Sequence, residues 1–568
     1  MTSTKIVVAA IDFGTTFSGY AFSFAHDYEN DPLKIQTNHW IGGGHLSLKA
    51  PTSILFSPDK QFHSFGYEAE DKYSDLAEED MHSDWYFFRR FKMILHQNKV
   101  LSRKTLLLEV NRKPLSALTV FSEAIKYLKK NLTETIFMRI TGFEESDIHW
   151  VLTVPAIWTD AAKQFMREAA LQAGINGECL ELVLEPEAAS AFCKCLPVER
   201  LKGGKSMTFD CFLPGTCYIV LDLGGGTVDI TVHCVQEDGT LSEVAKASGG
   251  AWGGTQVDDA YLGCLAEMFG TKVIETFREE HTGDFLDLMR DFEVKKRAIS
   301  EEKKGNIVLR IPAAFGETYK SLNSNPISKH IFKGRFAEIT QLKRDKLNIN
   351  VDVFKQFFAS SISNTIEHVK RILTENECSN ISTILLVGGF AESEIVQQRV
   401  REAFPNKRVI VPSESGLSVL KGAVLLGHDP RIMKSRISKY TYGLEIISRF
   451  ETGQPEKYKV FENEEFKCRY IFEKFVRAGE TVPVGTIVEK RYITDTFDVK
   501  EGLGLYASTE ENPQFVTEES CFKIGTVKFE KPRERFKLEM HFGETEILLK
   551  FIFDDGKRQT EKINFLCD

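Results

Sequence analysis

The sequence predicts an α/β protein with two similar lobes, followed by a C-terminal module of antiparallel β-strands. The first indication is a supersecondary unit that occurs twice, in which an acid-glycine-threonine turn joins two β-rich runs. The second is an amphipathic helical pattern that runs directly into a short apolar strand pattern, as in an α/β unit. The third is a change near residue 430, after which short alternating segments replace helical periodicity.

The repeated unit appears once at the N-terminus and once near the middle of the chain. Its first copy surrounds the turn Asp12–Thr16 and its second the turn Asp222–Thr227. We expect the flanking strands at residues 5–11, 17–24, 217–221 and 228–232. Two copies of one unit in a single chain imply two similar lobes.

Helix and strand signals between and after the two copies complete the lobes. A strand ends at Pro155, Thr159 or Asp160 can cap the helix that follows, and Gly174 closes that helix. Apolar residues at helical spacing predict one amphipathic helix over residues 354–373. A buried strand over residues 384–389 follows it and breaks on two glycines.

From Tyr440 onward the pattern is that of a separate antiparallel β module. Asp555-Gly556 is a strong signal for a two-residue hairpin between the last two strands. We expect a two-lobed domain over residues 1–433, a solvated basic linker over 434–439 and a β-rich domain over 440–568. Strands are predicted at residues 459–462, 470–475, 485–492, 497–506, 536–542 and 545–553.

Composition excludes several classes of protein. The chain has 568 residues, 72 basic and 81 acidic side chains and 42% hydrophobic residues, which is typical of a globular protein rather than a nucleic-acid-coating one. No apolar run is long enough for a signal sequence or a membrane span, so we expect no membrane insertion and a cytoplasmic location.

Cysteine usage favours a reducing compartment. The 11 cysteines are an odd number and form no C-x-x-C pair, so reduced thiols are expected. Cys193 and Cys195 are the one close pair, but no second pair lies nearby at ligand spacing, which disfavours a metal site there.

The two turns carry chemistry suited to a phosphate group. Gly14 allows the backbone to approach an oxyanion closely, while backbone N–H groups and the hydroxyls of Thr15 and Thr16 point to one place. The turn after Asp222 offers the same groups. If Asp12 and Asp222 face one another across a cleft, they can hold Mg²⁺ through its waters while both hairpins bind a polyphosphate. A single glycine turn would more often be an ordinary hairpin.

These motifs resemble those of the superfamily of actin, sugar kinases and heat-shock ATPases. The match rests on residues 11–18 and 221–229, similar to its two phosphate motifs, and on 386–390, similar to its adenosine motif. Residues 153–156 and the Glu185-Pro186-x-Ala188-Ala189 motif resemble the 70-kilodalton heat-shock branch. Residues 91–93 and 387–393 are most similar to its divergent 12 subfamily. The resemblance implies a two-lobed actin-like ATPase domain that binds ATP or ADP with Mg²⁺.

The resemblance also implies roles for individual residues. Lys92 would orient the attacking water and touch the γ-phosphate, although it is also consistent with a surface lysine. Glu185 would reach Mg²⁺-bound water, with an exposed glutamate as the alternative. The implied catalytic residues are Lys92, Glu185, Asp222 and Thr227; the implied metal residues are Asp12, Asp222 and Glu185, acting through waters. The implied phosphate cradle consists of Gly14, Thr15, Thr16, Phe17, Gly224, Gly225, Gly226 and Thr227.

The implied adenosine site draws on a helix and on glycine turns. Glu293 would bind the ribose hydroxyls, with Lys296, Arg297 and Ser300 around the base. Spacing independently places these four residues on one helical face, which could instead be a salt-bridged surface. The further nucleotide-binding residues are Gly254, Gly388, Gly389 and Phe390.

The chain departs from the family pattern at several positions. Phe390 and Glu392 stand where a serine and an arginine usually flank the adenine, so the stacking guanidinium is missing and Phe390 replaces part of its contact. Lys163 replaces an arginine of interdomain signalling. The basic residues 431–436 replace an acidic, leucine-rich linker. We expect no helical lid after the β module.

The resulting expectation is a chaperone-like ATP-binding protein of the stress response that hydrolyses ATP slowly. Its β module would bind a polypeptide client or a protein partner, with co-chaperones left open. Phe472, Phe475, Val482 and Val484 could line a binding groove, but core packing is the simpler expectation for each. One alternative is a nucleotide-gated scaffold with negligible hydrolysis. Another is a small-molecule kinase, which would need a substrate domain and a catalytic aspartate.

Overall fold

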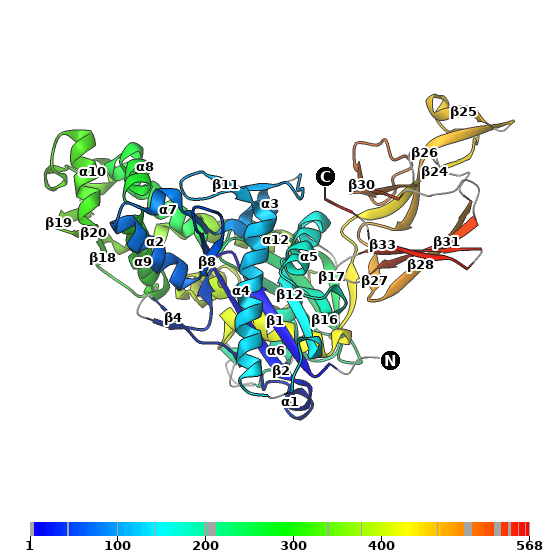
Figure 1. The fold of residues 1–568 in the computed structure, drawn as a ribbon, viewed down its shortest axis with the longest axis horizontal. Helices are drawn as coiled ribbons and strands as arrows, with labels where there is room; N and C mark the ends of the chain where they lie inside the picture. Colours follow the sequence, from blue (N-terminus) through cyan, green and yellow to red (C-terminus); the bar gives the residue numbers. More distant parts are fainter. Residues whose placement is uncertain are drawn as a thin grey trace.

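The computed structural model shows two α/β lobes side by side and a body of β-strands at one end of the molecule (Figure 1). This arrangement confirms the fold class that the sequence predicts. The structure describes residues 5–42, 45–98, 100–140, 142–197, 201–202, 212–337, 340–375, 378–462, 464–493, 503–527, 535–542, 547–554, 556–562 and 564–566.

The N-terminal lobe is built on a mixed sheet in the order β13-β12-β1-β2-β3, with β6 paired to β2. Alternate residues of β1 enter different cores, as the two-residue period of a strand requires. Ile11 packs with α4 and α5 on one face, whereas Val8 packs with α6 and α14 on the other. The elements are β1 Val7–Phe13, β2 Phe17–Phe24, β3 Gln36–Thr37, β6 Ala50–Pro51, β12 Ile148–Val154, β13 Leu180–Leu184, α4 Ala117–Phe137, α5 Asp160–Gln172, α6 Glu185–Cys195 and α14 Ser418–His428.

The second lobe is built on an eight-stranded sheet in the order β14-β22-β21-β15-β16-β17-β23-β27. Its β15–β16 hairpin repeats the β1–β2 hairpin. In each repeat the first strand also pairs with a parallel strand, β1 with β12 and β15 with β21. The elements are β14 Leu201–Lys202, β15 Cys217–Leu223, β16 Val228–Val235, β17 Leu241–Gly250, β21 Thr383–Val387, β22 Arg408–Pro412, β23 Met433–Ile437, β27 Thr481–Pro483, α7 Thr255–Phe269, α9 Thr282–Ala298, α12 Ala359–Ile372 and α13 Glu394–Ala403.

Helices α6 and α14 lie between the two central sheets and join the lobes. Residues of both helices share one core with β1 of the first lobe and β15 of the second. The two helices approach so closely that a Cβ atom on Gly422 would lie 1.6 Å from the carbonyl oxygen of Ala188. Only glycine fits this crossing.

Smaller elements extend both lobes above the central sheets. A three-stranded sheet with α2 belongs to the first lobe, and a second three-stranded sheet with α8 and α10 belongs to the second. These elements are α2 Tyr67–Glu78, β7 Ser53–Phe56, β8 Phe62–Phe65, β9 Tyr86–Arg89, α8 Thr271–Glu280, β18 Asn306–Arg310, α10 Ala313–Asn323, β19 Thr340–Lys343 and β20 Lys346–Asn350. Short peripheral elements are α1 Ala25–Asn30, β4 Trp40–Gly42, β5 His45–Ser47, α3 Ile94–Gln97, β10 Leu106–Leu108 and β11 Pro114–Ser116.

The helix signals of the sequence are partly confirmed. The Thr159 hydroxyl caps α5 by accepting from the Ala162 N–H at 3.3 Å, and the helix ends just before Gly174, whose φ is +85°. The single helix predicted over residues 354–373 is wrong, because α11 Val351–Gln356 and α12 are separated by a turn. At this turn Phe357 and Phe358 are both buried in the core, so the break allows both rings to pack inward.

The C-terminal β body consists of two antiparallel sheets around their own apolar core. All six predicted strands overlap observed ones, although residues 497–502, residues 545–546 and Asp555 lie outside the described residues. Phe475 and Val482 belong to this core, as expected for packing residues. The strands are β24 Thr441–Arg449, β25 Lys459–Glu462, β26 Glu465–Val476, β28 Thr486–Ile493, β29 Leu503–Ser508, β30 Cys521–Val527, β31 Arg535–Phe542, β32 Leu548–Phe553 and β33 Arg558–Lys562.

The expectation of a solvated basic linker is wrong for most of the segment. Residues 433–437 form β23, which pairs in parallel with β17 and antiparallel with β27 of the C-terminal body. The backbone groups of the linker therefore complete a sheet instead of facing water. The side chains of Arg431 and Lys434 do face water as predicted, since they are 87% and 51% exposed.

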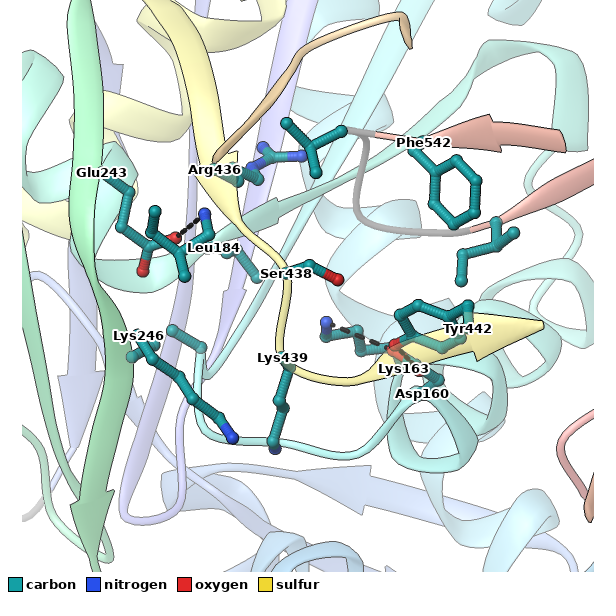
Figure 2. Close-up of a pocket in the computed structure, with 15 residues that line it drawn as sticks. Asp160, Lys163, Leu184, Glu243, Lys246, Arg436, Ser438, Lys439, Tyr442 and Phe542 are labelled. Atoms are coloured by element: carbon teal, nitrogen blue, oxygen red, sulfur yellow. Dashed lines mark hydrogen bonds and ion pairs between the residues drawn. The ribbon is translucent and has the colours of Figure 1, made fainter. Parts of the chain in front are cut away.

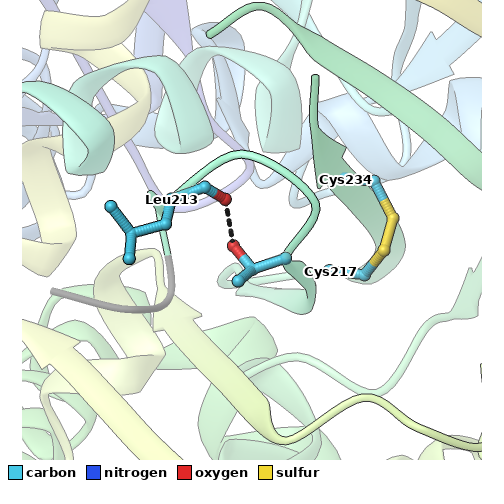
Figure 3. Close-up of a disulfide and its surroundings, with 4 residues drawn as sticks. Leu213, Cys217 and Cys234 are labelled. Carbon is cyan, nitrogen blue, oxygen red and sulfur yellow. Dashed lines mark hydrogen bonds between the residues drawn. A yellow bond between two sulfur atoms is a disulfide. The ribbon is translucent and has the colours of Figure 1, made fainter. Parts of the chain in front are cut away.

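The cysteines also differ from expectation. Cys217 and Cys234 lie directly opposite one another on β15 and β16 and form a disulfide (Figure 3), so the prediction of reduced thiols throughout is wrong. Cross-strand placement brings the two side chains together, which sequence spacing could not reveal. Within the described residues no cluster of metal-binding side chains is found, and no helix there is both long and apolar enough for a bilayer.

Candidate functional site

A cleft of about 1030 Å³ lies between the two lobes. Both repeated hairpins, α9 and the turn after β21 contribute to its walls. The sequence-predicted residues that line it are Asp12, Gly14, Thr15, Thr16, Phe17, Lys92, Glu185, Asp222, Gly224, Gly225, Gly226, Thr227, Gly254, Glu293, Lys296, Arg297, Gly388, Gly389 and Phe390.

Ser300 is the one predicted residue that does not line the cleft. Helix α9 ends at Ala298, and Ile299 adopts an extended backbone that buries its side chain in the core. The helical face inferred from spacing therefore stops before Ser300, and the role of Ser300 beside the base stays a prediction.

The two hairpins touch one another inside the cleft. A Cβ atom on Gly225 would lie 2.3 Å from the Thr16 hydroxyl oxygen, and one on Gly226 would lie 2.7 Å from that of Thr15. Gly388 has a φ of +87°, and its Cβ would lie 2.5 Å from a carboxylate oxygen of Asp222. The glycines thus allow the turn between β15 and β16 to approach the turn between β1 and β2, and the turn after β21 to approach Asp222.

Asp12 is the next-to-last residue of β1 and has two polar partners. The Lys49 ammonium donates to its carboxylate at 2.6 Å, and the Thr153 hydroxyl donates at 2.9 Å. Burial alone would raise the pKa of Asp12, but Lys49, with Lys92 and Thr153, outweighs burial and holds this pKa below its usual range. Lys49 also lines the cleft, although no sequence motif identifies it.

Lys92 and Glu185 form a buried ion pair with an N–O distance of 2.7 Å. The side chains are 5% and 12% exposed, so neither is the surface residue of the alternative interpretations. Burial, with the nearby charges of Asp12 and Asp229, raises the pKa of Glu185 to about 7 despite Lys92. The Lys92 ammonium also lies 5.1 Å from the centre of the Trp158 ring.

Asp222 is the next-to-last residue of β15 and is buried among other carboxylates. Burial, followed by the charges of Glu185, Asp229 and Asp12, raises its pKa well above the usual range. A carboxyl group buried in this way is either protonated or paired with a cation. Asp12, Glu185 and Asp222 all line the cleft but form no direct metal-binding group, so they would hold the Mg²⁺ that the family resemblance assigns to them through its waters.

The cleft-facing side of α9 carries a network of charges. Glu293 pairs with Lys296 at 2.5 Å and with Arg297 at 2.7 Å, and Lys296 also pairs with Asp258 at 2.6 Å. Burial would raise the pKa of Glu293, but the two cations lower it to about 2. The network is salt-bridged, as the alternative proposes, yet it lines the cleft rather than an open surface.

Phe390 stands at the turn after β21 and is 9% exposed. Its ring is nearly parallel to that of Phe358, with centroids 6.2 Å apart, and it lies against Gly254. Glu392 lines the same part of the cleft. This wall therefore offers an aromatic ring and a carboxylate where the family resemblance places a serine and an arginine.

Comparison with known proteins assigns the family. A family model described as Hsp70 protein matches residues 89–428, more than half of the chain. This chain belongs to the Hsp70 family. It is 35% identical to heat shock 70 kDa protein 12A of Mus musculus over 96% of this chain and 89% of that protein. It is also 35% identical to heat shock 70 kDa protein 12B of Homo sapiens, over 99% and 91% of the two chains.

Membership in the Hsp70 family, near its 12A and 12B members, makes this a chaperone-like ATP-binding protein. The Hsp70 domain implies that the nucleotide binds together with Mg²⁺. The lining residues of the cleft agree with that chemistry, since glycine turns and buried carboxylates lie side by side. The roles of individual residues in it stay predictions.

Proposed function

We propose that this Hsp70-family protein binds ATP in the interlobe cleft, hydrolyses it slowly and couples the nucleotide state to polypeptide binding. The observation that carries the proposal is the convergence of two matched hairpins at one point. Gly225 and Gly226 of the second lobe lie against the side chains of Thr16 and Thr15 of the first, and Asp12 and Asp222 line the same cleft. A ligand with several phosphate groups suits this cradle, because backbone N–H groups come from both sides.

In this proposal each wall of the cleft has a separate task. The turns Gly14–Phe17 and Gly224–Thr227 bind the phosphates, and the Lys92 ammonium orients the attacking water and contacts the γ-phosphate. Glu293 binds the ribose, and Phe390 packs against the base. When bound, Mg²⁺ neutralises charge on the phosphate oxygens.

The Lys92–Glu185 pair supports slow rather than fast hydrolysis. Its 2.7 Å ion pair ties up the ammonium that the proposal directs toward the γ-phosphate. Breaking a buried ion pair costs energy, and that cost adds to the barrier of the chemical step. The same pairing favours the second candidate function, a nucleotide-gated scaffold with negligible turnover.

The C-terminal β body is the proposed site for a polypeptide client or protein partner. Strand β25 lies at the edge of its sheet, and beside it Phe461 and Phe466 are 65% and 55% exposed. An exposed strand edge with aromatic side chains suits an extended polypeptide.

Two measurements on the full chain test the proposal. Millimolar Mg-ATP should raise the melting temperature, because a ligand that binds only the folded state stabilises it. In single-turnover assays, Lys92→Ala should hydrolyse ATP at least about 100-fold more slowly than wild type while still binding it. An unchanged melting temperature would refute nucleotide binding, whereas binding without measurable wild-type turnover would favour the scaffold.

A further inference from the structure

A second cavity, of about 100 Å³, lies where both lobes meet the C-terminal body (Figure 2). Its walls come from α5 of the first lobe, β17 of the second, the segment after β23 and strands of the C-terminal body. Within the described residues it shares no lining residue with the nucleotide cleft. One water molecule occupies about 30 Å³ in the liquid, so the cavity has room for a group of the size of one phosphate.

Four basic side chains line this cavity, and two of them already have acidic partners. Arg436 donates to both carboxylate oxygens of Glu187, at 2.6 and 2.7 Å. Lys163 pairs with Asp160 at 3.5 Å. The positive charge of these two side chains is therefore balanced within the protein.

The other two cations, Lys246 of β17 and Lys439, form no ion pair among the described residues. Lys439 donates to the carbonyl oxygens of Ile157 and Trp158, at 2.9 and 3.3 Å, which leaves one of its three N–H donors. Both ammonium groups lie 5.6 Å from the centre of the Tyr440 ring, and Figure 2 shows them reaching toward the same side of the cavity. Two unpaired positive charges thus converge there.

The surroundings do not neutralise these two charges. Burial and the nearby charge of Lys163 lower the pKa of Lys439 to about 8, and Lys246 adds to this shift although Asp160 opposes it. Glu243 also lines the cavity, but burial raises its pKa to about 7, so part of it is protonated at neutral pH. An anion bound between the two ammonium groups would offset their repulsion.

We propose that this cavity binds a small oxyanion, inorganic phosphate or the phosphate group of a small ester, between Lys246 and Lys439. Ammonium groups form short, charge-assisted hydrogen bonds with phosphate oxygens, and the free donors of both lysines are available for them. One bound anion would contact the second lobe through Lys246 and the segment after β23 through Lys439. The site goes beyond the proposed function, because it requires no nucleotide.

Calorimetry on the full chain, in chloride buffer at constant ionic strength, tests the proposal. Inorganic phosphate should bind with a Kd of about 1 mM or less. Lys246→Met should weaken this binding at least about tenfold, because it removes one charged donor, whereas Lys246→Arg keeps the charge and should stay near wild type. Titration with glycerol phosphate separates the two sources of the group: a similar Kd identifies an ester, and binding of phosphate alone identifies the free anion.

Two further variants separate this cavity from other places where phosphate can bind. Gly225→Ala disturbs the phosphate turns of the nucleotide cleft and should keep wild-type affinity for phosphate. Lys272→Met removes an exposed lysine of α8 that lines neither cavity, and it should also keep it. Loss of binding in Gly225→Ala, equal losses in Lys246→Met and Lys272→Met, or an unchanged Kd in Lys246→Met would overturn the proposal. Absence of binding to wild type at about 10 mM phosphate would overturn it as well and leave the proposed ATP site intact.

Melting temperatures distinguish a binding site from a structural role of Lys246. Without phosphate, Lys246→Met should melt at the wild-type temperature or above it, because the variant removes a repulsive charge. Phosphate should raise the melting temperature of wild type and leave that of the variant unchanged. A lower melting temperature of Lys246→Met in phosphate-free buffer would show a structural role and contradict the proposal.

Discussion

Adding one methyl group at Gly225 should separate the two hairpins and weaken nucleotide binding. The Cβ atom of Gly225→Ala would lie 2.3 Å from the Thr16 hydroxyl oxygen and 3.0 Å from Thr16 Cβ. Ordinary contacts begin at 3.4 Å, so the turns must separate by about 1 Å while the Thr16 side chain keeps its rotamer. The backbone conformation of Gly225 is one that alanine can adopt, because its φ lies outside the left-handed region.

A displacement of about 1 Å in a positioning group can cost on the order of 100-fold in rate. We therefore expect Gly225→Ala to bind Mg-ATP at least about tenfold more weakly by calorimetry and to slow single-turnover hydrolysis by about 100-fold. Gly263→Ala is the control, since nothing lies within 4 Å of a Cβ at that helical position. It should bind as wild type does. Wild-type affinity in Gly225→Ala, with a normal melting temperature, would refute the claim that hairpin contact shapes the phosphate site.

Two further predictions concern stability. Burial raises the pKa of Glu243 from the usual glutamate value of 4.5 to about 7. The contribution of Glu243 to the free energy of unfolding is therefore fully present below about pH 4.5 and is lost as pH rises through 7. In wild type the free energy of unfolding should fall between pH 4.5 and 7, and Glu243→Gln should make this fall smaller by up to about 3 kcal/mol, as measured by urea titration at several pH values. The same dependence of stability on pH in the variant and in wild type would contradict the raised pKa of Glu243. The Cys217–Cys234 disulfide spans 17 residues, so dithiothreitol should lower the unfolding free energy by up to about 3 kcal/mol. Cys217→Ser should show the same loss and no response to reductant, whereas a response in the variant would show that another bond is involved.

The cleft was predictable where its chemistry is local in sequence. The Asp12 and Asp222 turns each place an acid, glycines and a threonine within a few residues, and the strands on either side carry a clear apolar pattern. The β pattern after Tyr440 was visible for the same reason, because alternation needs only neighbouring residues.

The parts that sequence did not predict depend on contacts between distant segments. Lys49 lies 37 residues from Asp12 in a segment without a motif, so only the fold reveals their ion pair. From the sequence alone Arg436 is expected to face water, because its acidic partner Glu187 lies 249 residues earlier in the chain. Spacing also could not show that α9 ends at Ala298, before Ser300, because the end of the helix coincides with the burial of Ile299 in the core.

A crystal structure of the full chain with Mg²⁺ and a non-hydrolysable ATP analogue tests the central claim most directly. We expect density for the three phosphates between the turns at Gly14–Phe17 and Gly224–Thr227, with the metal ion beside Asp12 and Asp222. An empty cleft at millimolar analogue, or a nucleotide bound to another surface, would contradict the account.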